Sequence, residues 1–209
     1  MASSVLSSFI VIAGVGGAGC KAVAELRLPS SERASCLLVD TDEISLKRFQ
    51  AQHSVLLGGG KLAPGLDGPS PKWVRDCFRE QENVFKALLR HTRHLIIVAG
   101  LGGIVGGELS PLLFEFATND GIKTYGVFAL PLACEASSRR YRTENALDAI
   151  RRSRQPHLCY PFESEWKSLA TQMTIPTYLT YLQQRIQLGA TVWLDLISEL
   201  YLESNLFDA

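Results

Sequence analysis

The sequence predicts an α/β fold in which a parallel sheet is covered by helices on both faces. Short β-branched runs such as FIVIAGV (9–15) and HLIIVAG (94–100) alternate with longer amphipathic stretches along the chain. Parallel neighbouring strands need crossover helices, and this alternation supplies them. We expect one domain over residues 1–209, with an α/β sheet core at 9–174 and a long terminal helix at 175–207.

The individual elements follow from short runs bounded by turn residues. The strand pattern occupies residues 9–15, 35–40, 54–57, 94–100, 123–130 and 157–161. The helical pattern occupies residues 17–27, 43–49, 71–91, 107–118, 137–152, 163–172 and 176–205. The third of these helices has a clear start, because Ser70 can cap it and Pro71 suits the first helical position.

Composition and charge predict a globular protein that does not bind nucleic acid. Hydrophobic residues make up 46% of the 209 residues and charged residues 20%, which is sufficient for a buried core. The 21 basic residues are balanced by 21 acidic ones, so the positive excess that non-specific nucleic-acid binding needs is missing. Five scattered cysteines without a CxxC pair favour reduced thiols over disulfides or a metal site.

The sequence also predicts a cytoplasmic location. The first residues, MASSVLSSF, carry no Lys or Arg ahead of the apolar stretch, unlike a signal peptide. No apolar run approaches the ~18–20 residues that a membrane span requires. We therefore expect no direct membrane insertion.

Glycine-rich loops precede several of the expected helices. Ligands of a parallel sheet bind beyond the carboxyl ends of the strands. There the segment GVGGAGC fits GxGxxG with Gly14, Gly16 and Gly19, and it leads into a helix whose backbone N–H groups and dipole would face an anion. The loops GLDGPSP (65–71) and GLGGIVGG (100–107) also precede helix starts.

The number of these loops favours a nucleoside triphosphate as the ligand. A dinucleotide has one pyrophosphate and needs one glycine loop, whereas several loops can close on one triphosphate. The chain has no GxxxxGK[ST] motif, so it is not a P-loop protein. Two alternatives remain: tight strand–helix packing explains a single GxGxxG, and an NAD(P)-binding domain is supported by that motif with Asp40 and Asp42.

Five segments, in order, resemble the tubulin/FtsZ family. FIVIAGVGGAGCKAV looks like the first strand and phosphate loop, LLVDTDEISLKR is similar to a VNTDAQALK-type segment, and GLDGPSPKWVRD to GAGANPEVGR. IIVAGLGGIVGGELSP stands where the signature AGMGGGTGTGAAP would, and LPLACEASSRRYRTENALDAI resembles the PFxFEGxxR segment and its helix. The resemblance covers residues 9–152 and implies a Rossmann-like fold of the family's N-terminal GTPase domain, which binds GTP or GDP.

The resemblance also implies a set of site residues. Glu135 matches the family glutamate that binds ribose, and Arg139 matches the arginine near the phosphates. Their spacing puts both side chains on one helix face. Mg²⁺ is a candidate companion of the nucleotide. The implied nucleotide-binding residues are Gly14, Gly16, Gly17, Ala18, Gly19, Cys20, Lys21, Asp40, Gly68, Ser70, Gly102, Gly103, Ile104, Val105, Gly106, Glu135, Arg139 and Phe162.

The signature loop departs from the family pattern. Glycines and two threonines of the family become Ile104, Val105, Gly107 and Glu108, so the hydroxyls are lost and backbone donors remain. We place Glu108 in the first turn of the helix. There its carboxylate would repel a phosphate ~5 Å away by about 1–3 kcal/mol, or interact with it through Mg²⁺, or simply stabilise the helix start.

The base-recognition side departs as well. Lys21 and Phe162 stand where the family has asparagines, the first of which contacts guanine. Polar and aromatic residues at the start of the last helix are further candidates, which could stack a base or belong to the core: Tyr178, Tyr181, Gln183 and Gln184. The specificity for guanine is therefore open.

The family has a second domain after the long helix, and we expect this chain to be a minimal form without it. In the family, hydrolysis needs an acidic loop that one subunit offers to the nucleotide of the next, and Asp208 is the local candidate for that catalytic acid. Apolar residues surround much of the last helix: Trp193, Leu194, Ile197, Leu200, Tyr201 and Phe207. They predict a contact with a second copy or another FtsZ-like protein, unless the helix bends and packs on itself.

Two functional hypotheses follow. The first is an FtsZ-like GTP-binding protein whose hydrolysis is slow or depends on assembly, with catalysis needing another subunit. The second is a pseudo-GTPase that keeps the fold, has lost GTP binding and acts as an interaction scaffold.

Overall fold

The computed structural model describes residues 9–28, 34–49, 53–61, 68–132, 135–160 and 174–206, without the side chains of residues 175, 178 and 200–206. Several predictions lie outside the described residues. They concern the helix at 163–172, the residues Phe162, Phe207 and Asp208, and the side chains of Tyr178, Leu200 and Tyr201.

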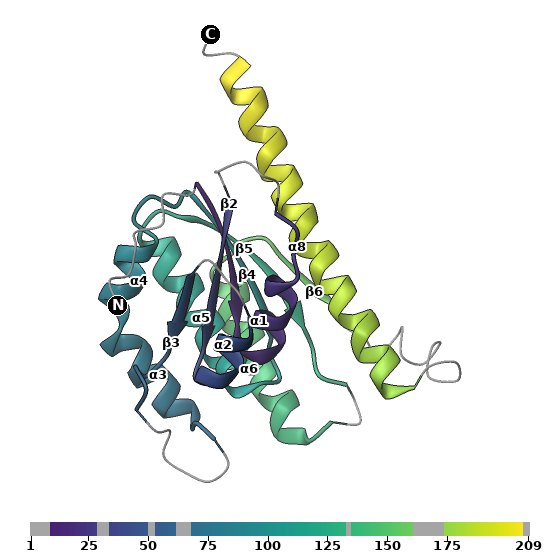
Figure 1. Ribbon diagram of the computed structural model, residues 1–209. Helices are drawn as coiled ribbons and strands as arrows, with labels where there is room; N and C mark the ends of the chain where they lie inside the picture. The colour runs from purple at the N-terminus through teal and green to yellow at the C-terminus, as the bar shows by residue number, and fades with distance from the viewer. Residues whose placement is uncertain are drawn as a thin grey trace.

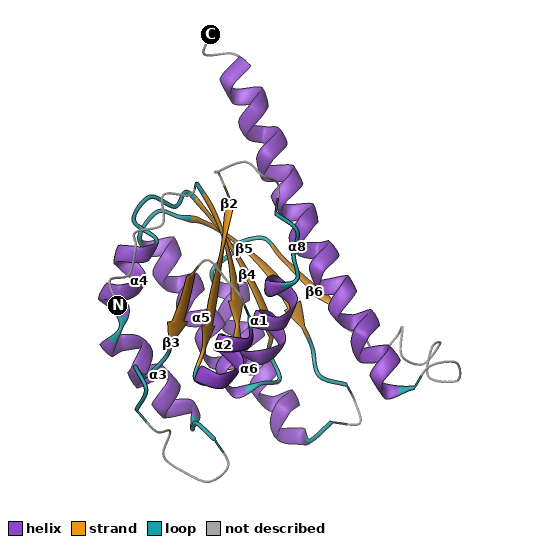
Figure 2. Ribbon diagram, in the orientation of Figure 1, coloured by secondary structure: helices purple, strands orange, loops and turns teal. Residues whose placement is uncertain are grey.

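Six strands form one parallel sheet, as predicted (Figures 1 and 2). They are β1 (Ile10–Val15), β2 (Ala34–Asp40), β3 (His53–Leu56), β4 (His94–Gly100), β5 (Lys123–Ala129) and β6 (His157–Tyr160). The strand order is β3-β2-β1-β4-β5-β6, and every neighbouring pair is parallel. In this doubly wound order the direction of winding reverses between β1 and β4, which is where such sheets bind ligands.

Helices connect the strands and cover both faces of the sheet. They are α1 (Gly16–Ala24), α2 (Glu43–Arg48), α3 (Pro71–Glu80), α4 (Glu82–Leu88), α5 (Ile104–Asn119), α6 (Ser137–Arg152) and α8 (Ile175–Leu206). One apolar core lies between the sheet and α3, α4, α5 and α6, and a second lies between the sheet and α1, α2 and α8. The inner strands β1 and β2 are buried along their whole length, because both of their faces are covered.

The helix predicted over residues 71–91 is divided into α3 and α4 at Gln81. The side chain of Gln81 accepts a hydrogen bond from the Gly58 N–H at 2.7 Å and donates one to the Leu56 carbonyl at 3.2 Å. Gln81 thereby ties the break between the two helices to the turn after β3. This long-range contact is invisible in a local helical pattern.

Helix α8 lies across the sheet on the α1 side and extends beyond it. A Cβ at Gly189 would lie 3.0 Å from Val127, and the Trp193 indole N–H donates to the Gly126 carbonyl at 3.3 Å. Thus α8 runs antiparallel to β5 and begins towards the carboxyl ends of the strands. Its last turns project past the opposite edge of the sheet (Figure 1). Among the described residues, no helix is both long and apolar enough to cross a membrane.

Candidate functional site

The carboxyl ends of β1 and β4 lie next to each other and lead directly into α1 and α5. Val15 pairs with Ala99 in the sheet register. The two helix starts are in contact, since a Cβ built on Gly16 would lie 3.1 Å from the Gly106 nitrogen. The first and the last of the predicted glycine loops therefore meet at the point where the winding of the sheet reverses.

Three helix starts at this edge lack a side-chain cap. The N-cap residues Val15 of α1, Gly103 of α5 and Ala136 of α6 make no side-chain capping bond. Of the other helices described, Asp42 caps α2 and Ser70 caps α3, whereas Gln81 at the start of α4 makes no side-chain capping bond. First-turn N–H groups without a cap, together with the helix dipole, form a ready site for an anion.

Two glycines of the first loop are required by packing. A Cβ on Gly14 would lie 2.6 Å from the Gly19 carbonyl oxygen, and one on Gly19 would lie 2.1 Å from the Val98 carbonyl oxygen. These contacts match the strand–helix packing that we had kept as an alternative explanation of GxGxxG. Gly16 adds a positive φ of +69°, a conformation that side chains rarely adopt.

Gly17 has none of these requirements. It is exposed, its φ is not positive, and a Cβ there would meet only the Asp40 Oδ2 atom, at the ordinary contact distance of 3.9 Å. The residue lies in the first turn of α1, where glycine costs stability relative to alanine. Neither packing nor backbone conformation therefore explains glycine at this position.

The other side chains of this loop divide between core and surface. Cys20 is buried, and its thiol donates to the Gly14 carbonyl at 3.2 Å. Burial, with the Asp40 charge as a smaller cause, raises the pKa of Cys20 to about 12, so the thiol stays neutral. Ala18 and Lys21 are exposed. Cys20 is fully buried and belongs to the core, whereas the Lys21 side chain is accessible.

Asp40 ends β2 beside the start of α1. Its side chain is 6% exposed and accepts a hydrogen bond from the Thr41 N–H at 2.7 Å. Burial raises the pKa of this carboxyl, and the hydrogen bond from Thr41 opposes the rise. Within the described part of the chain, no three His, Cys, Asp or Glu residues gather in a way that could hold a metal ion. Asp40 alone is therefore not a metal site.

Glu135 and Arg139 contact each other and the loop after β4. The Arg139 guanidinium pairs with Glu135 at 2.8 Å, and its Nε donates to the Gly102 carbonyl at 3.3 Å. The second carboxylate oxygen of Glu135 accepts the Leu132 N–H at 2.7 Å. Arg142, from the next turn of α6, also donates to the Gly102 carbonyl. Two arginines of α6 thus converge on one carbonyl of the signature loop.

Glu108 is not in the first turn of α5, contrary to the prediction. The helix begins at Ile104, three residues earlier than expected, so that Glu108 falls in the second turn. Its carboxylate is paired with the guanidinium of Arg75 on α3. The side chains are 17% exposed for Glu108 and 40% for Arg75. Glu108 therefore joins two helices.

The remaining predicted residues lie at helix starts. Ile104, Val105 and Gly106 form the first turn of α5, and Val105 and Gly106 are buried. Gly68 is exposed, and a Cβ there would meet no atom within 4 Å among the described residues. The Ser70 hydroxyl accepts the Trp73 N–H at 3.2 Å and so acts as a cap.

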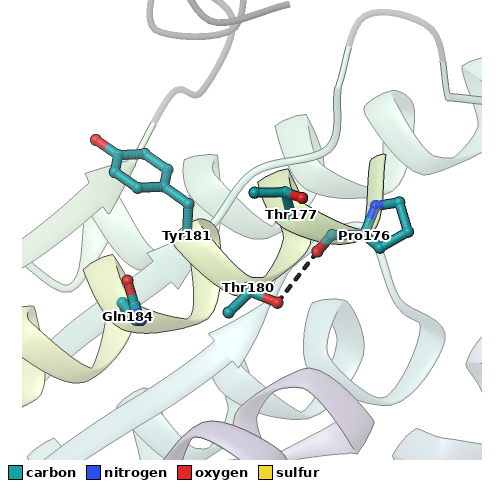
Figure 3. Close-up of a pocket in the computed structure, with 5 residues that line it drawn as sticks. All are labelled: Pro176, Thr177, Thr180, Tyr181 and Gln184. Carbon is teal, nitrogen blue, oxygen red and sulfur yellow. Dashed lines mark hydrogen bonds between the residues drawn. The ribbon is translucent and has the colours of Figure 1, made fainter. Parts of the chain in front are cut away.

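A hollow of about 440 Å³ lies beside the first turns of α8 (Figure 3). It is lined by Pro176, Thr177, Thr180, Tyr181 and Gln184. Figure 3 shows the Thr180 hydroxyl bonded to the Pro176 carbonyl, at 3.1 Å.

Two of the candidates named for the base, Tyr181 and Gln184, thus share this hollow. Gln183 does not line it with them. Its amide donates to the Glu25 carboxylate on α1, so Gln183 helps to dock α8 on that helix.

Comparison with known families decides the assignment of the chain. Residues 9–164 match the model of the tubulin/FtsZ family, GTPase domain. The chain belongs to this family. The tubulin/FtsZ assignment covers every element from β1 to β6, and it confirms the resemblance inferred from the glycine loops.

Relatives in sequence are cell division proteins. The chain is 31% identical over 147 residues to cell division protein FtsZ 1 of Methanocaldococcus jannaschii, which covers 70% of this chain and 39% of that protein. It is 29% identical over 143 residues to FtsZ of Rickettsia typhi, covering 68% of this chain and 32% of that protein. The chain thus spans well under half the length of these relatives.

Solved structures agree on the fold. An empty FtsZ dimer from M. jannaschii superposes with a TM-score of 0.75 at 22% identity, covering 86% of this chain and 52% of that one. The GDP-bound monomer of CetZ1 from Haloferax volcanii gives a TM-score of 0.67 at 16% identity, covering 85% of this chain and 57% of that one. These likenesses support the tubulin/FtsZ fold that the sequence predicts.

Sequence reasoning missed two side chains that shape the site, Arg142 and Arg75. A signal for the first was present, because the segment RRYR puts three arginines near the start of α6, where the helix dipole disfavours positive charge. No local signal pointed to Arg75, since its partner Glu108 is 33 residues away in sequence.

Proposed function

We propose that this chain binds GTP and GDP at the edge where β1 and β4 end. The observation that carries the proposal is the meeting of two uncapped helix starts, with Gly16 and Gly106 in contact. The phosphates would accept hydrogen bonds from the first-turn N–H groups of α1 and α5. Gly17, which packing does not require, would allow the phosphates to approach the backbone.

The ribose would lie at Glu135, between the phosphates and the base. Glu135 already uses both carboxylate oxygens, and each oxygen has a further lone pair for a ribose hydroxyl. The base would occupy the hollow beside α8, with the Tyr181 ring as a stacking surface and the Gln184 amide at its edge. Mg²⁺ would be held mainly by phosphate oxygens, because the described residues offer no carboxylate cluster.

Hydrolysis would be slow in the single chain and would depend on assembly. The catalytic acid would come from another subunit, with Asp208 the candidate within this sequence. Phosphate release per chain should then rise with protein concentration. A rate per chain that is constant across concentrations would contradict catalysis between subunits.

The exposed side of α8 would make the contact between subunits. Leu188, Val192 and Leu196 repeat every four residues and are 52%, 42% and 44% exposed. We call these three residues the α8 stripe. An exposed apolar stripe of this kind is typical of an interface. The partner would be a second copy or another FtsZ-like protein.

A second candidate function is a pseudo-GTPase scaffold. The observation that favours it is the apolar first turn of α5, where Ile104 and Val105 offer no hydroxyl to phosphate or magnesium. In that case the α8 stripe would act without nucleotide. Thermal unfolding with GTP, GDP and NADH separates the hypotheses. The proposed function requires stabilisation by GTP and GDP, a scaffold requires none, and stabilisation by NADH alone would indicate a dinucleotide site.

A further inference from the structure

Arg142 lies three residues after Arg139, beyond the end of the family segment that Glu135 and Arg139 match. Its guanidinium donates to the Gly102 carbonyl, which also accepts the Nε of Arg139 at 3.3 Å. Gly102 belongs to the loop that leads into α5. Arg142 is therefore held at the candidate phosphate loop.

The stem of Arg142 lies against the start of α5, where this chain has glycine. A Cβ on Gly107 would lie 3.0 Å from both Cγ and Cδ of Arg142, and 2.6 Å from the Leu101 carbonyl oxygen. The family signature has a threonine at position 107. The loss of that hydroxyl and the close approach of the arginine stem thus occur at the same place.

The charges around Gly102 are unbalanced without an anion. Arg139 is paired with Glu135, whereas Arg142 has no carboxylate partner among the described residues. Arg139 lies in the first turn of α6, where the helix dipole disfavours cations, and Arg142 lies about one turn further along. A guanidinium has five N–H donors, and the Gly102 carbonyl engages one nitrogen of Arg142. An anion at this loop would relieve the repulsion and use the spare donors.

We propose that Arg142 binds the terminal phosphate of a nucleoside triphosphate and replaces the threonine hydroxyl that position 107 lacks. The inference rests on the proposed nucleotide function. Arg142 would act beside Arg139, and the pair would favour a triphosphate over a diphosphate. A guanidinium suits this role because its charge is permanent and its donors fork towards phosphate oxygens.

Calorimetric titration of the full chain with a non-hydrolysable GTP analogue and with GDP, both with Mg²⁺, tests this proposal. The variants are Arg142→Gln and Arg142→Lys, and Arg152→Gln on the exposed last turn of α6 is the matched control. We expect Arg142→Gln to weaken the GTP analogue about tenfold and GDP by less than about threefold, because one charge-assisted contact to the terminal phosphate is lost. The affinity of Arg142→Lys for the GTP analogue should lie between those of the wild type and Arg142→Gln. Arg152→Gln should bind both nucleotides as the wild type does.

An unchanged ratio of GTP-analogue to GDP affinity in Arg142→Gln would overturn the proposal, and so would an equal loss of both with a lower unfolding temperature. The latter result would make Arg142 a support of the loop alone. If Arg142→Gln does not fold, the ratio of GTP-analogue to GDP affinity in Arg142→Lys tests the proposal by the same criterion. A wild-type chain that binds neither nucleotide would overturn the proposed function and this inference together.

Discussion

The guanidinium of Arg75 on α3 is paired with the carboxylate of Glu108 on α5. The pair joins the two helices whose starts carry the second and third glycine loops of the sequence. Arg75 thereby pairs the negative charge of Glu108 close to the candidate phosphate site. Of the three roles that the sequence leaves open for Glu108, repulsion of phosphate is therefore not expected.

Removing either partner of this pair should cost stability. Arg75→Gln leaves the carboxylate of Glu108 largely buried and unpaired, and should lower the free energy of unfolding by about 1–3 kcal/mol. Glu108→Gln should cost less, because Arg75 is 40% exposed and can turn to water. Urea unfolding of both variants and the double variant measures the coupling. Additive losses in the double variant would show that the pair does not couple α3 to α5.

GTP affinity should change little in Glu108→Gln, by less than about twofold, because the Arg75 side chain left unpaired is 40% exposed and water screens the change in charge. A marked gain in affinity, largest without Mg²⁺, would instead support repulsion of phosphate by Glu108.

Gly17→Asp should abolish nucleotide binding and leave the fold intact. The new side chain has space in the structure but brings a second carboxylate near Asp40, whose Oδ2 lies 3.9 Å from the new Cβ. The helix dipole favours an acidic residue in the first turn by about 0.3–1 kcal/mol, which opposes this repulsion. Facing a phosphate, the same charge and bulk would block the site. Circular dichroism and thermal unfolding monitor the fold, and calorimetric titration with GTP monitors binding.

Gly17→Ala is the matched control for the charge, and should raise stability by about 0.5–1 kcal/mol. Gly16 is less suitable for such a test, although the sequence points to it first. Its φ of +69° and its contact with Gly106 mean that Gly16→Val would disturb the helix starts themselves. If Gly17→Asp binds GTP as the wild type does, the first loop is not part of the site.

Asp40→Asn should stabilise the protein at neutral pH. Burial raises the pKa of Asp40 above its ordinary value of 3.8. A carboxyl whose pKa is raised by folding contributes fully to the stability of the protein at pH values below its pKa in the unfolded state. This contribution is lost as the pH rises through the pKa of the group in the folded state. Asparagine keeps the shape and does not ionise. The variant should therefore gain about 1.4 kcal/mol for each pH unit that separates the two pKa values.

Urea unfolding of Asp40→Asn and wild type at about pH 4 and about pH 8 measures this gain, which should be present at the higher pH and small at the lower. A variant that is less stable than wild type at the higher pH would show that the ionised carboxylate is favourable, contrary to the effect of burial.

Val192→Glu in the α8 stripe should weaken self-association without unfolding the chain. The residue is 42% exposed, so a charge there costs the single chain little but would be buried in an interface. Thr191→Glu, the exposed neighbouring residue on α8, is the control. Sedimentation velocity with and without GTP compares the three proteins. Equal association of wild type and Val192→Glu would exclude the α8 stripe as the interface.

The fold could be predicted from the sequence because strand and helix patterns alternate along the chain. Strand runs such as 94–100 and the helix at 137–152 match β4 and α6 residue for residue. The predicted helix bounds are wrong where no local signal in the sequence sets the end of a helix. Gln81 breaks a continuous helical pattern by bonding to the turn after β3, and the start of α5 lies within a glycine-rich segment that has no local cap.

The site was accessible only in part, for a related reason. Glycines in a sequence indicate tight turns and close backbone approaches, so the loops at Gly16 and Gly106 could be predicted from the sequence. A motif does not reveal which glycines are required by packing, as Gly19 is, and which are not, as at Gly17. Nor does it reveal that Arg142 reaches the Gly102 carbonyl, since the two residues are 40 positions apart.

Calorimetric titration of the wild-type chain and Gly17→Asp with GTP and Mg²⁺ tests the central claim most directly. The claim is that two uncapped helix starts bind the phosphates of a guanine nucleotide. It predicts saturable binding of one GTP per chain to the wild type and none to the variant, with both proteins folded. GTP that binds neither protein, or binds both equally, would contradict it.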